Sequence, residues 1–330
     1  MQNNIEALIR KKLKTTEVKA IETIQSLWSG YGKIVRLDIK GVPAFSSAIL
    51  KHIVLPQDQQ HPRGWNTNVS HQRKLKSYQI EMNWYAEYAA KCNDACRVAT
   101  CYYSDTLGEE QLILLEDLDV SGFPLRKSAL NINEVKVCLK WLANFHATFL
   151  DVQPKGLWKV GTYWNLATRP EEYEVMKNTS LRKIANQIDE LLNNCVFKTL
   201  VHGDAKVANF CFSESGKHVA AVDFQYVGGG CGMKDVSYLL GSCLDEEECE
   251  LFESELLNYY FDELQKAIIK QKKTINFTAL EKEWRYLFPV AWADFNRFLD
   301  GWMPTHQKLN SYSKKIEKEV LKKLTIKTWQ

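Results

Sequence analysis

Two short polar segments near the middle of the chain constrain this sequence more than any other feature. Residues 202–209 read HGDAKVAN, and residues 222–224 read VDF at the end of an apolar run. This arrangement predicts two turns that carry three oxygen-bearing side chains, those of Asp204, Asn209 and Asp223. Either aspartate alone would be an ordinary turn residue, because Asp is common in turns. Both at this spacing indicate a shared site on neighbouring turns.

The spacing of these residues is typical of a phosphoryl-transfer site. The catalytic loop of eukaryotic-type kinases contains a His, then an Asp, and then an Asn five positions after that Asp. An Asp-Phe later in the chain supplies the second metal ligand. We therefore expect Asp204 to be the general base and Asn209 and Asp223 to hold Mg²⁺. Mg²⁺ takes few protein carboxylates beside nucleotide phosphates, so this sparse set is sufficient. Lys206 is either a contact for the transferring phosphate or an exposed loop lysine.

Composition excludes several other classes of protein. The 330 residues contain 43 Lys and Arg against 40 Asp and Glu, a near balance that argues against a nucleic-acid partner. The sequence has no apolar run of about 18 residues and no signal-peptide pattern, so we expect a soluble, cytoplasmic protein without a membrane partner. The nine cysteines form no C-x-x-C pair, which favours reduced core thiols over a metal site. The oligomeric state stays open.

Residue patterns predict a β-rich segment followed by a mostly helical one. Turn residues alternate with apolar stretches over residues 27–55, and residues 111–118 form a buried strand pattern. Apolar residues at three- and four-residue spacing predict helices over residues 75–90, 135–149, 246–269 and 284–302. The expected fold is α+β with two lobes. Residues 1–118, which include an N-terminal helix, form the nucleotide-binding lobe, and residues 119–330 form the catalytic and substrate-binding lobe.

A kinase site also requires a lysine for the nucleotide phosphates and a glutamate that orients it. Lys51 ends an apolar strand pattern, and Glu81 lies on the helix predicted next, with Glu87 as its competitor. Both are otherwise solvated charges, as most Lys and Glu are. Gly30 and Gly32, in a predicted hairpin turn that starts at Ser29, would let backbone N–H groups approach the phosphates.

A glycine run and an aspartate follow the second polar segment. The run 228–232 invites a dinucleotide-binding interpretation, but Met233 occupies the position of the third glycine and no N-terminal first strand precedes it. We expect a flexible loop beside the metal site. Asp235 is expected to be the N-cap of a helix and to tether the catalytic loop. His202 is expected to support the geometry of that loop, and His146 to be a hydrogen-bonded core histidine.

These residues together resemble the aminoglycoside phosphotransferase and choline kinase superfamily, and more closely its ecdysteroid-kinase-like (CHK kinase-like) branch. The resemblance covers most of the chain and rests on Lys51, Glu81 with Trp84 and Tyr85, LLEDL at 114–118, FHA at 145–147, HGD at 202–204, Asn209, and VDFQ at 222–225. It implies a protein-kinase-like fold that uses ATP and Mg²⁺ to phosphorylate a hydroxyl of a small molecule, with a choline-, aminoglycoside- or ecdysteroid-like acceptor. By that resemblance Glu116 and Leu118 are hinge positions that hold adenine. Lys206 and Gln225 depart from the family and kinase patterns, which leaves the acceptor in doubt.

Three other functions compete with a small-molecule kinase. The first is a protein kinase, which the short segment after Asp223 and the lack of an Ala-Pro-Glu disfavour. The second is a non-catalytic nucleotide-binding regulatory module, and the third is an NAD-dependent oxidoreductase that rests on the glycine run alone. The acceptor pocket is expected beside the C-terminal helices, and the aromatic candidates for it are Trp164, Tyr226, Trp284, Trp292, Trp302 and His306. Asp294 and Asp300 would favour a cationic acceptor if they faced the cleft.

Overall fold

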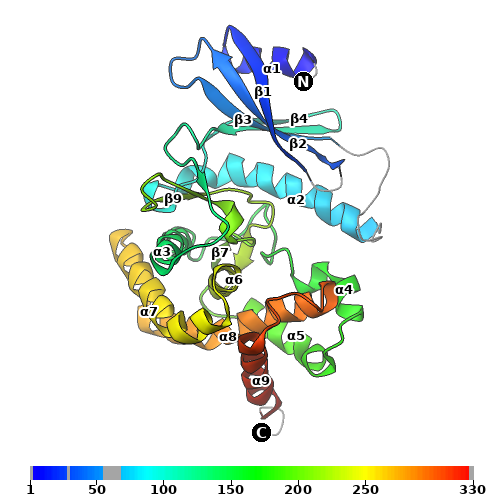
Figure 1. Ribbon diagram of the computed structural model, residues 1–330, viewed down its shortest axis with the longest axis vertical. Coiled ribbons are helices and arrows are strands. Elements are labelled where there is room, and N and C mark those ends of the chain that lie inside the picture. The colour runs from blue at the N-terminus through cyan, green and yellow to red at the C-terminus, as the bar shows by residue number, and fades with distance from the viewer. Residues whose placement is uncertain (1–2, 28–29, 55–67, 327–330) are drawn as a thin grey trace.

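The computed structural model describes residues 3–27, 30–54 and 68–326, and these form two lobes (Figure 1). A β-sheet with one helix lies at one end of the molecule, and a larger bundle of helices occupies the other end. This arrangement confirms the α+β, two-lobed fold class. Ser29 and Leu55, which belong to the predicted turn and strand region, lie outside the described residues. No described helix is long and apolar enough to cross a bilayer.

The N-terminal sheet has five antiparallel strands. In sheet order they are β1 (Glu17–Ser26), β2 (Gly32–Lys40), β3 (Ser47–Ile53), β5 (Glu110–Glu116) and β4 (Cys101–Leu107). Successive side chains of a strand point to opposite faces. Leu50 therefore packs into the apolar cluster on the face that α1 (Asn3–Leu13) covers through Ile5 and Ile9, and Lys51 points to the other face.

Strand β1 was not predicted from the sequence. Most of its side chains are exposed, including those of Ile21 and Ile24, so the sequence lacks the apolar alternation that marks a half-buried strand. Its place in the sheet comes from backbone pairing with β2, which is irregular at two positions. The structure shows that a strand at the edge of a sheet needs no hydrophobic pattern when its neighbour supplies the hydrogen bonds.

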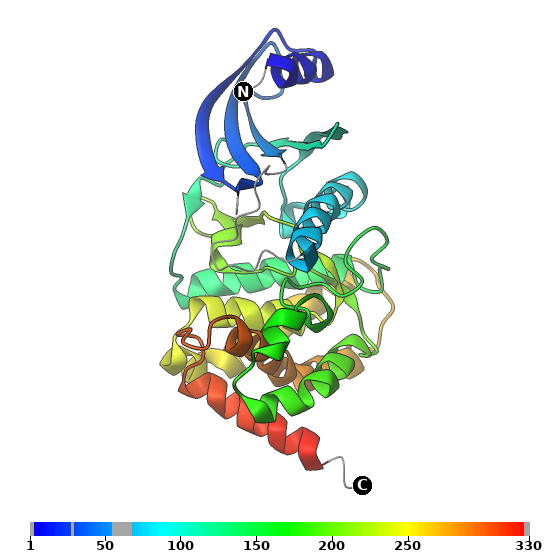
Figure 2. The same ribbon diagram turned by 90° about the vertical axis from the view of Figure 1, so that its right-hand side faces the viewer.

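Helix α2 (Asn68–Glu87) lies between the sheet and the second lobe (Figures 1 and 2). It starts before the predicted residue 75 and ends three residues before the predicted residue 90. Tyr78, Trp84 and Tyr85 are buried on the side that faces the core. The ring of Trp84 stacks on that of Phe224, with centroids 4.4 Å apart. Packing of this kind fixes α2 to the turn that follows Asp223.

The second lobe is mainly helical, as predicted. Its helices are α3 (Ile132–Thr148), α4 (Pro170–Glu174), α5 (Thr179–Asn193), α6 (Met233–Cys243), α7 (Glu246–Lys270), α8 (Phe277–Trp302) and α9 (Ser311–Ile326). Asn131 is the N-cap of α3 and Asp245 is the N-cap of α7, each with a capping box that satisfies free backbone N–H groups. The buried faces of α3, α6, α7 and α8 share one core.

Short strands complete this lobe and correct one expectation. They are β6 (Leu125–Arg126), β7 (Thr199–Val201), β8 (Phe210–Phe212), β9 (Val219–Ala221) and β10 (Gly228–Gly230). The glycine run begins with β10, which pairs antiparallel with β7, so it is a strand and not the flexible loop we expected. A Cβ atom at Gly228 would lie 2.3 Å from the carbonyl oxygen of Trp158, which explains the glycine. An antiparallel strand here excludes a dinucleotide-binding turn.

Candidate active site

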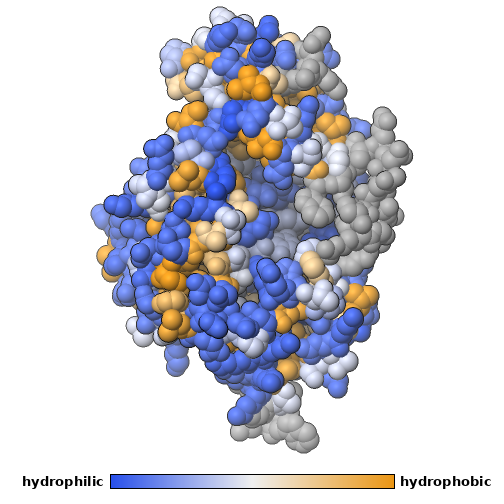
Figure 3. Space-filling model, viewed as in Figure 1, coloured by the Kyte–Doolittle hydropathy of each residue, from blue (hydrophilic) through white to orange (hydrophobic). Residues whose placement is uncertain are grey.

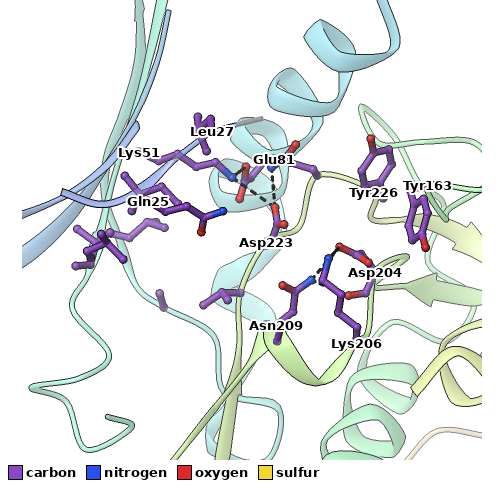
Figure 4. Close-up of a pocket in the computed structure, with 18 of the residues that line it drawn as sticks. Gln25, Leu27, Lys51, Glu81, Tyr163, Asp204, Lys206, Asn209, Asp223 and Tyr226 are labelled. Carbon is purple, nitrogen blue, oxygen red and sulfur yellow. Dashed lines mark hydrogen bonds and ion pairs between the residues drawn. The ribbon is translucent and has the colours of Figure 1, made fainter. Parts of the chain in front are cut away.

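A cavity of about 850 Å³ lies between the two lobes, where the surface is hollowed in Figure 3. It brings together eight of the ten residues that the sequence nominated, from both lobes: Lys51, Glu81, Glu116, Leu118, Asp204, Lys206, Asn209 and Asp223. Gly30 and Gly32 are not among the described residues that line it, although Leu27 and Tyr31 of the same turn are. Figure 4 shows Lys51 and Leu27 on one side of Asp223, and Tyr163 and Tyr226 beyond Asp204 on the other.

Asp235 anchors the backbone of the predicted catalytic loop, residues 202–209. This buried carboxylate accepts the backbone N–H groups of His202 at 2.6 Å and Gly203 at 2.9 Å, and lies 3.1 Å from Nε2 of His146. Gly203 has a φ of +81°, and a Cβ there would lie 2.1 Å from the carbonyl oxygen of Tyr226. A tether was therefore the right expectation for Asp235. The N-cap was wrong, because Gly232 takes that place and Asp235 lies in the first turn of α6.

The two histidines of this region have supporting positions. Nδ1 of His202 accepts the backbone N–H of Asp204 at 3.2 Å, and its Nε2 lies 3.0 Å from the carbonyl oxygen of Val222. His202 therefore connects the catalytic loop to the turn that carries Asp223. His146 is fully buried and hydrogen-bonded to Tyr260 as well as to Asp235, as a core histidine should be.

Asp204 presents its carboxylate to three donors. Oδ2 accepts from Nζ of Lys206 at 2.9 Å and from Nδ2 of Asn209 at 3.0 Å, and Oδ1 accepts from the hydroxyl of Tyr238 at 3.2 Å. Burial raises the pKa of Asp204, the charge of Lys206 opposes this, and the charge of Asp223 adds to it. A carboxylate with a raised pKa is a stronger proton acceptor than an exposed one, which suits a general base.

Asp223 lies opposite, on the turn after β9. Its φ of +69° is unusual for a residue other than glycine, and such strain persists where the surroundings hold it. Burial would raise the pKa of Asp223, but the charges of Lys51, Lys206 and Lys74 outweigh it and lower the pKa to about 2. The carboxylate is therefore ionised at every physiological pH.

The donor set fits a hard divalent cation. Nδ2 of Asn209 donates to both the carbonyl oxygen and the carboxylate of Asp204, so its Oδ1 is the atom left for a cation. Oδ1 of Asn209 and the ionised carboxylate of Asp223 are oxygen donors on adjacent turns (Figure 4). Mg²⁺ accepts such ligands and completes its shell with water and phosphate oxygens.

Lys51 and Glu81 form a buried ion pair at the sheet side of the cavity. Nζ of Lys51 lies 2.5 Å from Glu81 and 3.5 Å from Asp223, so Lys51 connects the sheet to α2 and to the turn after β9. Glu81 is thus the partner of Lys51, and Glu87 is the last residue of α2. Burial lowers the pKa of Lys51, but the two carboxylates outweigh it and raise the pKa. The lysine stays charged.

The link between the lobes is dense in ion pairs. Arg36 on β2 contacts Asp117 at 2.9 Å and also pairs with Glu22 and Asp119, while the Glu116 carboxylate pairs with Arg97. The side chain of Glu116 is therefore occupied by Arg97, and any contact of this position with adenine would use the backbone.

The far half of the cavity differs from the sequence expectation. Tyr226 and Trp302 line it as expected, together with Tyr163, Phe298, Arg73 and Arg169, which the sequence did not indicate. Phe298 and Trp302 stand four residues apart on one face of α8 and stack with centroids 5.6 Å apart. The four-residue spacing of these two aromatic residues was the one sequence signal that could have placed Phe298 beside Trp302.

Several predicted pocket residues lie elsewhere. Trp164, Trp284 and Trp292 are buried in the core, and His306 is not among the described residues that line the cavity. Asp294 accepts from the indole of Trp164 at 3.0 Å and pairs with Arg297. Asp300 accepts the backbone N–H of Asn178 at 2.7 Å. Neither acid faces the cleft, so they give no support for a cationic acceptor.

Sequence comparison decides the family. The ecdysteroid kinase-like family matches residues 61–156 and 161–273, which is more than half of the chain. The chain belongs to the ecdysteroid kinase-like family. This confirms the resemblance drawn from the motifs and makes the protein an enzyme of the small-molecule kinase class. No curated protein matches the sequence significantly.

Solved structures share this fold. Amicoumacin kinase hAmiN, in complex with AMP-PNP, Ca²⁺ and Ami, is 15% identical with a TM-score of 0.51, over 99% of this chain and 94% of that one. Choline kinase from Cryptosporidium parvum Iowa II is 12% identical with a TM-score of 0.53, over 99% and 97% of the two chains. At these identities the likeness shows a shared fold.

In this ecdysteroid kinase-like protein, Lys51→Met is expected to destabilise the fold by about 3–5 kcal/mol, as loss of one partner of a buried ion pair usually does. The variant removes the cation that pairs with both Glu81 and Asp223. Denaturant unfolding measures the effect. Adding Glu81→Gln to Lys51→Met should recover part of the loss, because it removes one of the unpaired charges. A single variant as stable as the wild type would contradict the importance of this pair.

Tyr238→Phe is expected to move the acid limb of the kcat/KM profile to higher pH by up to about one unit. The hydroxyl of Tyr238 bonds the ionised form of Asp204, so its removal raises the pKa of the base and protonation then inactivates it at higher pH. The phenyl ring preserves the packing against Trp164 and Phe295. An acid limb at the same pH as in the wild type would show that this bond does not affect Asp204.

Proposed function

We propose that this protein transfers the γ-phosphate of Mg-ATP to a hydroxyl group of a small molecule. The observation that supports this most is the meeting of Asp204, Asn209 and Asp223 with the buried Lys51–Glu81 pair in one cavity. Phosphoryl transfer needs positioning and charge stabilisation more than covalent help, and these five residues supply both.

Each residue has one task in this proposal. Asp204 accepts the proton of the acceptor hydroxyl. The oxygen of that hydroxyl bonds to the γ-phosphorus as the bond between the γ-phosphorus and the ADP oxygen breaks. Asn209 and Asp223 would hold Mg²⁺, which neutralises charge on the phosphate oxygens when bound. Lys51, oriented by Glu81, binds phosphate oxygens. Lys206 adjoins Asp204, where its charge would meet the transferring group.

The nucleotide half is proposed on the same basis. The backbone at Glu116 and Leu118 would hold adenine, and the turn with Gly30 and Gly32 would cover the phosphates. Gly30 has a φ of +75° and Gly32 one of +117°, conformations that glycine adopts without strain. We propose residues 1–118 as the nucleotide-binding lobe and 119–330 as the catalytic and substrate-binding lobe.

The structural relatives support this proposal. One was solved with AMP-PNP and Ca²⁺, and the other is named a choline kinase. We extend to this chain the use of a nucleoside triphosphate, with Mg²⁺ as the physiological cation. A cytoplasmic location is also proposed. All nine cysteines lie among the described residues and are free thiols, which is usual in a reducing compartment.

A protein substrate fits this site less well. Residues 224–232 alone separate Asp223 from α6, and three of them form β10. This segment is too short and too buried to serve as an activation segment on which a peptide docks. We therefore favour a small-molecule acceptor over a protein.

The direct test is a screen of small alcohols with Mg-ATP, in which ADP release is measured and the phosphorylated product is identified by mass spectrometry. We expect turnover with at least one class of alcohol, and none when Mg²⁺ is removed with a chelator. The Asp204→Asn protein, purified in parallel, controls for contaminating kinases. Failure of the wild-type protein to bind Mg-ATP would refute the proposed function.

A further inference from the structure

Apart from three acids at its centre, the acidic side chains that line the cavity gather in one half of it, together with the basic side chains of Arg36, Arg126 and Lys127. Apart from Glu81, Asp204 and Asp223, the acids among its described lining residues are Glu22, Glu116, Asp117 and Asp119. All four lie on β1, at the end of β5 or on the link after it, and all four pair with Arg36 or Arg97. In the other half, α2 and the segment before α4 contribute Arg73 and Arg169, while Lys74 lies near Asp223, whose pKa its charge lowers.

Arg73 lies far from the phosphate end of the cavity. It is eight residues before Glu81 on α2, which corresponds to about 12 Å along a regular helix. Its guanidinium donates to the carbonyl oxygen of Thr168 at 2.7 Å and to the hydroxyl of Ser70 at 3.2 Å, which are uncharged acceptors. No ion pair to Arg73 occurs within the described residues. Among the described residues, these hydrogen bonds leave the buried guanidinium without a carboxylate in direct contact.

Arg169 places a second guanidinium beside that of Arg73, and the two residues form one wall of the cavity. Its Nε donates to the carbonyl oxygen of Tyr163 at 2.6 Å, and it pairs with the buried Glu172 at 3.0 Å. Burial lowers the pKa of Arg73, and the neighbouring charge of Arg169 lowers it further, so the two cations are close enough to repel. Glu171 and Glu172 lie near them, but neither lines the cavity. The two arginines therefore line the cavity while their acidic neighbours do not.

Aromatic rings connect this wall to the catalytic base. The guanidinium of Arg169 lies 5.9 Å from the centroid of the Tyr163 ring and 5.2 Å from that of Phe298. The hydroxyl of Tyr163 lies 3.1 Å from that of Tyr238, which donates to Asp204. An acceptor whose hydroxyl reaches Asp204 would thus extend along Tyr163 and Tyr226, which lie together on that side in Figure 4, toward the arginines.

We propose that the acceptor is an alcohol with an apolar body and an anionic group, a carboxylate or a phosphate, which Arg73 and Arg169 bind. This rests on the proposed function and specifies its substrate class. Two guanidinium groups match the geometry of an oxyanion, and the anion relieves their repulsion. Tyr163, Tyr226 and Phe298 pack against the apolar body. A cationic alcohol would meet Arg73 and Arg169 at the same place, which disfavours amino alcohols.

The test uses matched alcohols that differ in one group: 4-(hydroxymethyl)benzoate, 4-(hydroxymethyl)phenyl phosphate, 4-(hydroxymethyl)benzamide and 4-(hydroxymethyl)benzylamine. Binding of each, up to millimolar concentration, is measured by calorimetry on the full-length protein with Mg²⁺ and AMP-PNP. We expect the carboxylate or the phosphate to bind about 10- to 100-fold more tightly than the amide, and the amine to bind most weakly. The stronger of the two anions identifies the preferred class.

Variants separate this wall from general electrostatics. Arg73→Gln should reduce the ratio of anion to amide affinity to within about threefold of one, and Arg73→Lys should keep part of it. Arg169→Lys provides a second variant that keeps a partner for Glu172. Lys76→Gln is the matched control, because Lys76 is an exposed residue of α2 that packs on Trp158 and does not line the cavity. It should leave the ratio unchanged.

The outcomes distinguish this inference from the proposed function. An amide or amine that binds as well as both anions, a ratio that Arg73→Gln leaves unchanged, or no measurable binding of either anion would overturn the inference. Binding of AMP-PNP with Mg²⁺ is measured in the same samples. Loss of nucleotide binding in the wild-type protein would instead count against the kinase proposal itself.

Discussion

Asp204→Asn is expected to lower kcat about 10²–10⁴-fold while the affinity for Mg-ATP stays within a few-fold of the wild type. The amide keeps the size of the side chain, but it cannot accept the proton of the acceptor hydroxyl. Lys206, Asn209 and Tyr238 donate hydrogen bonds to the carboxylate. The backbone of the loop is held separately by Asp235, so the loop should keep its shape. Steady-state ADP release measures kcat, and titration with a fluorescent nucleotide measures the affinity.

The stability of the variant provides the control for folding. The pKa of Asp204 is raised in the folded protein, so ionisation of this buried carboxyl opposes folding, and that cost grows as the pH rises through the folded pKa. A neutral Asn removes this cost, and the melting temperature at neutral pH should not fall. Asp262→Asn, at an exposed position of α7, is the matched variant and should retain full turnover. Near-normal turnover in folded Asp204→Asn would remove Asp204 from the role of base.

Asp223→Asn is expected to weaken Mg²⁺-dependent nucleotide binding and to lower kcat/KM by about 10²–10⁴-fold. Asn can adopt the positive φ of this position, so the backbone should be preserved while the ligand loses its charge. Nucleotide titrations at several Mg²⁺ concentrations should show a higher Mg²⁺ requirement in the variant. Nucleotide binding without Mg²⁺ should change less, because Lys51 remains paired with Glu81.

The pH dependence of stability offers an independent check on Asp223. Its folded pKa is lowered to about 2, so its charge stabilises the fold above the ordinary pKa of an aspartate, and this contribution is lost as the pH falls toward 2. Asp223→Asn should therefore be less stable than the wild type at neutral pH, and the difference should shrink in acid. An unchanged Mg²⁺ titration in the folded variant would exclude Asp223 as a metal ligand.

The meeting of the proposed catalytic residues could be predicted from the sequence because most of them lie close together along the chain. Residues 202–209 and the turn at Asp223 flank the two strands β8 and β9, so local pairing is enough to bring Asp204, Asn209 and Asp223 together. Lys51 could be recognised because a charge in an apolar strand is uncommon.

The acceptor half could not be predicted in the same way. Trp164 and Trp284 are large aromatic residues whose indole N–H groups find partners inside the core, on Asp294 and on the carbonyl oxygen of Phe197. Residue type alone does not distinguish such a ring from one that lines a cavity, because both are apolar with one polar atom. Tyr163 and Arg169 lie in an irregular segment without periodicity, so no pattern marked them.

The sequence by itself determined the residues of the proposed catalytic centre, Asp204, Asn209, Asp223 and Lys51, since short motifs encode residues that local turns and neighbouring strands bring together. The tertiary structure decided which side chains line the other half of the cavity. The wall with Arg73 and Arg169 forms where α2, the segment before α4 and the end of α8 meet. Arg73 and Trp302, which both line the cavity there, are 229 positions apart in the sequence. Contacts over such separations depend on how the lobes pack, and no local pattern records them.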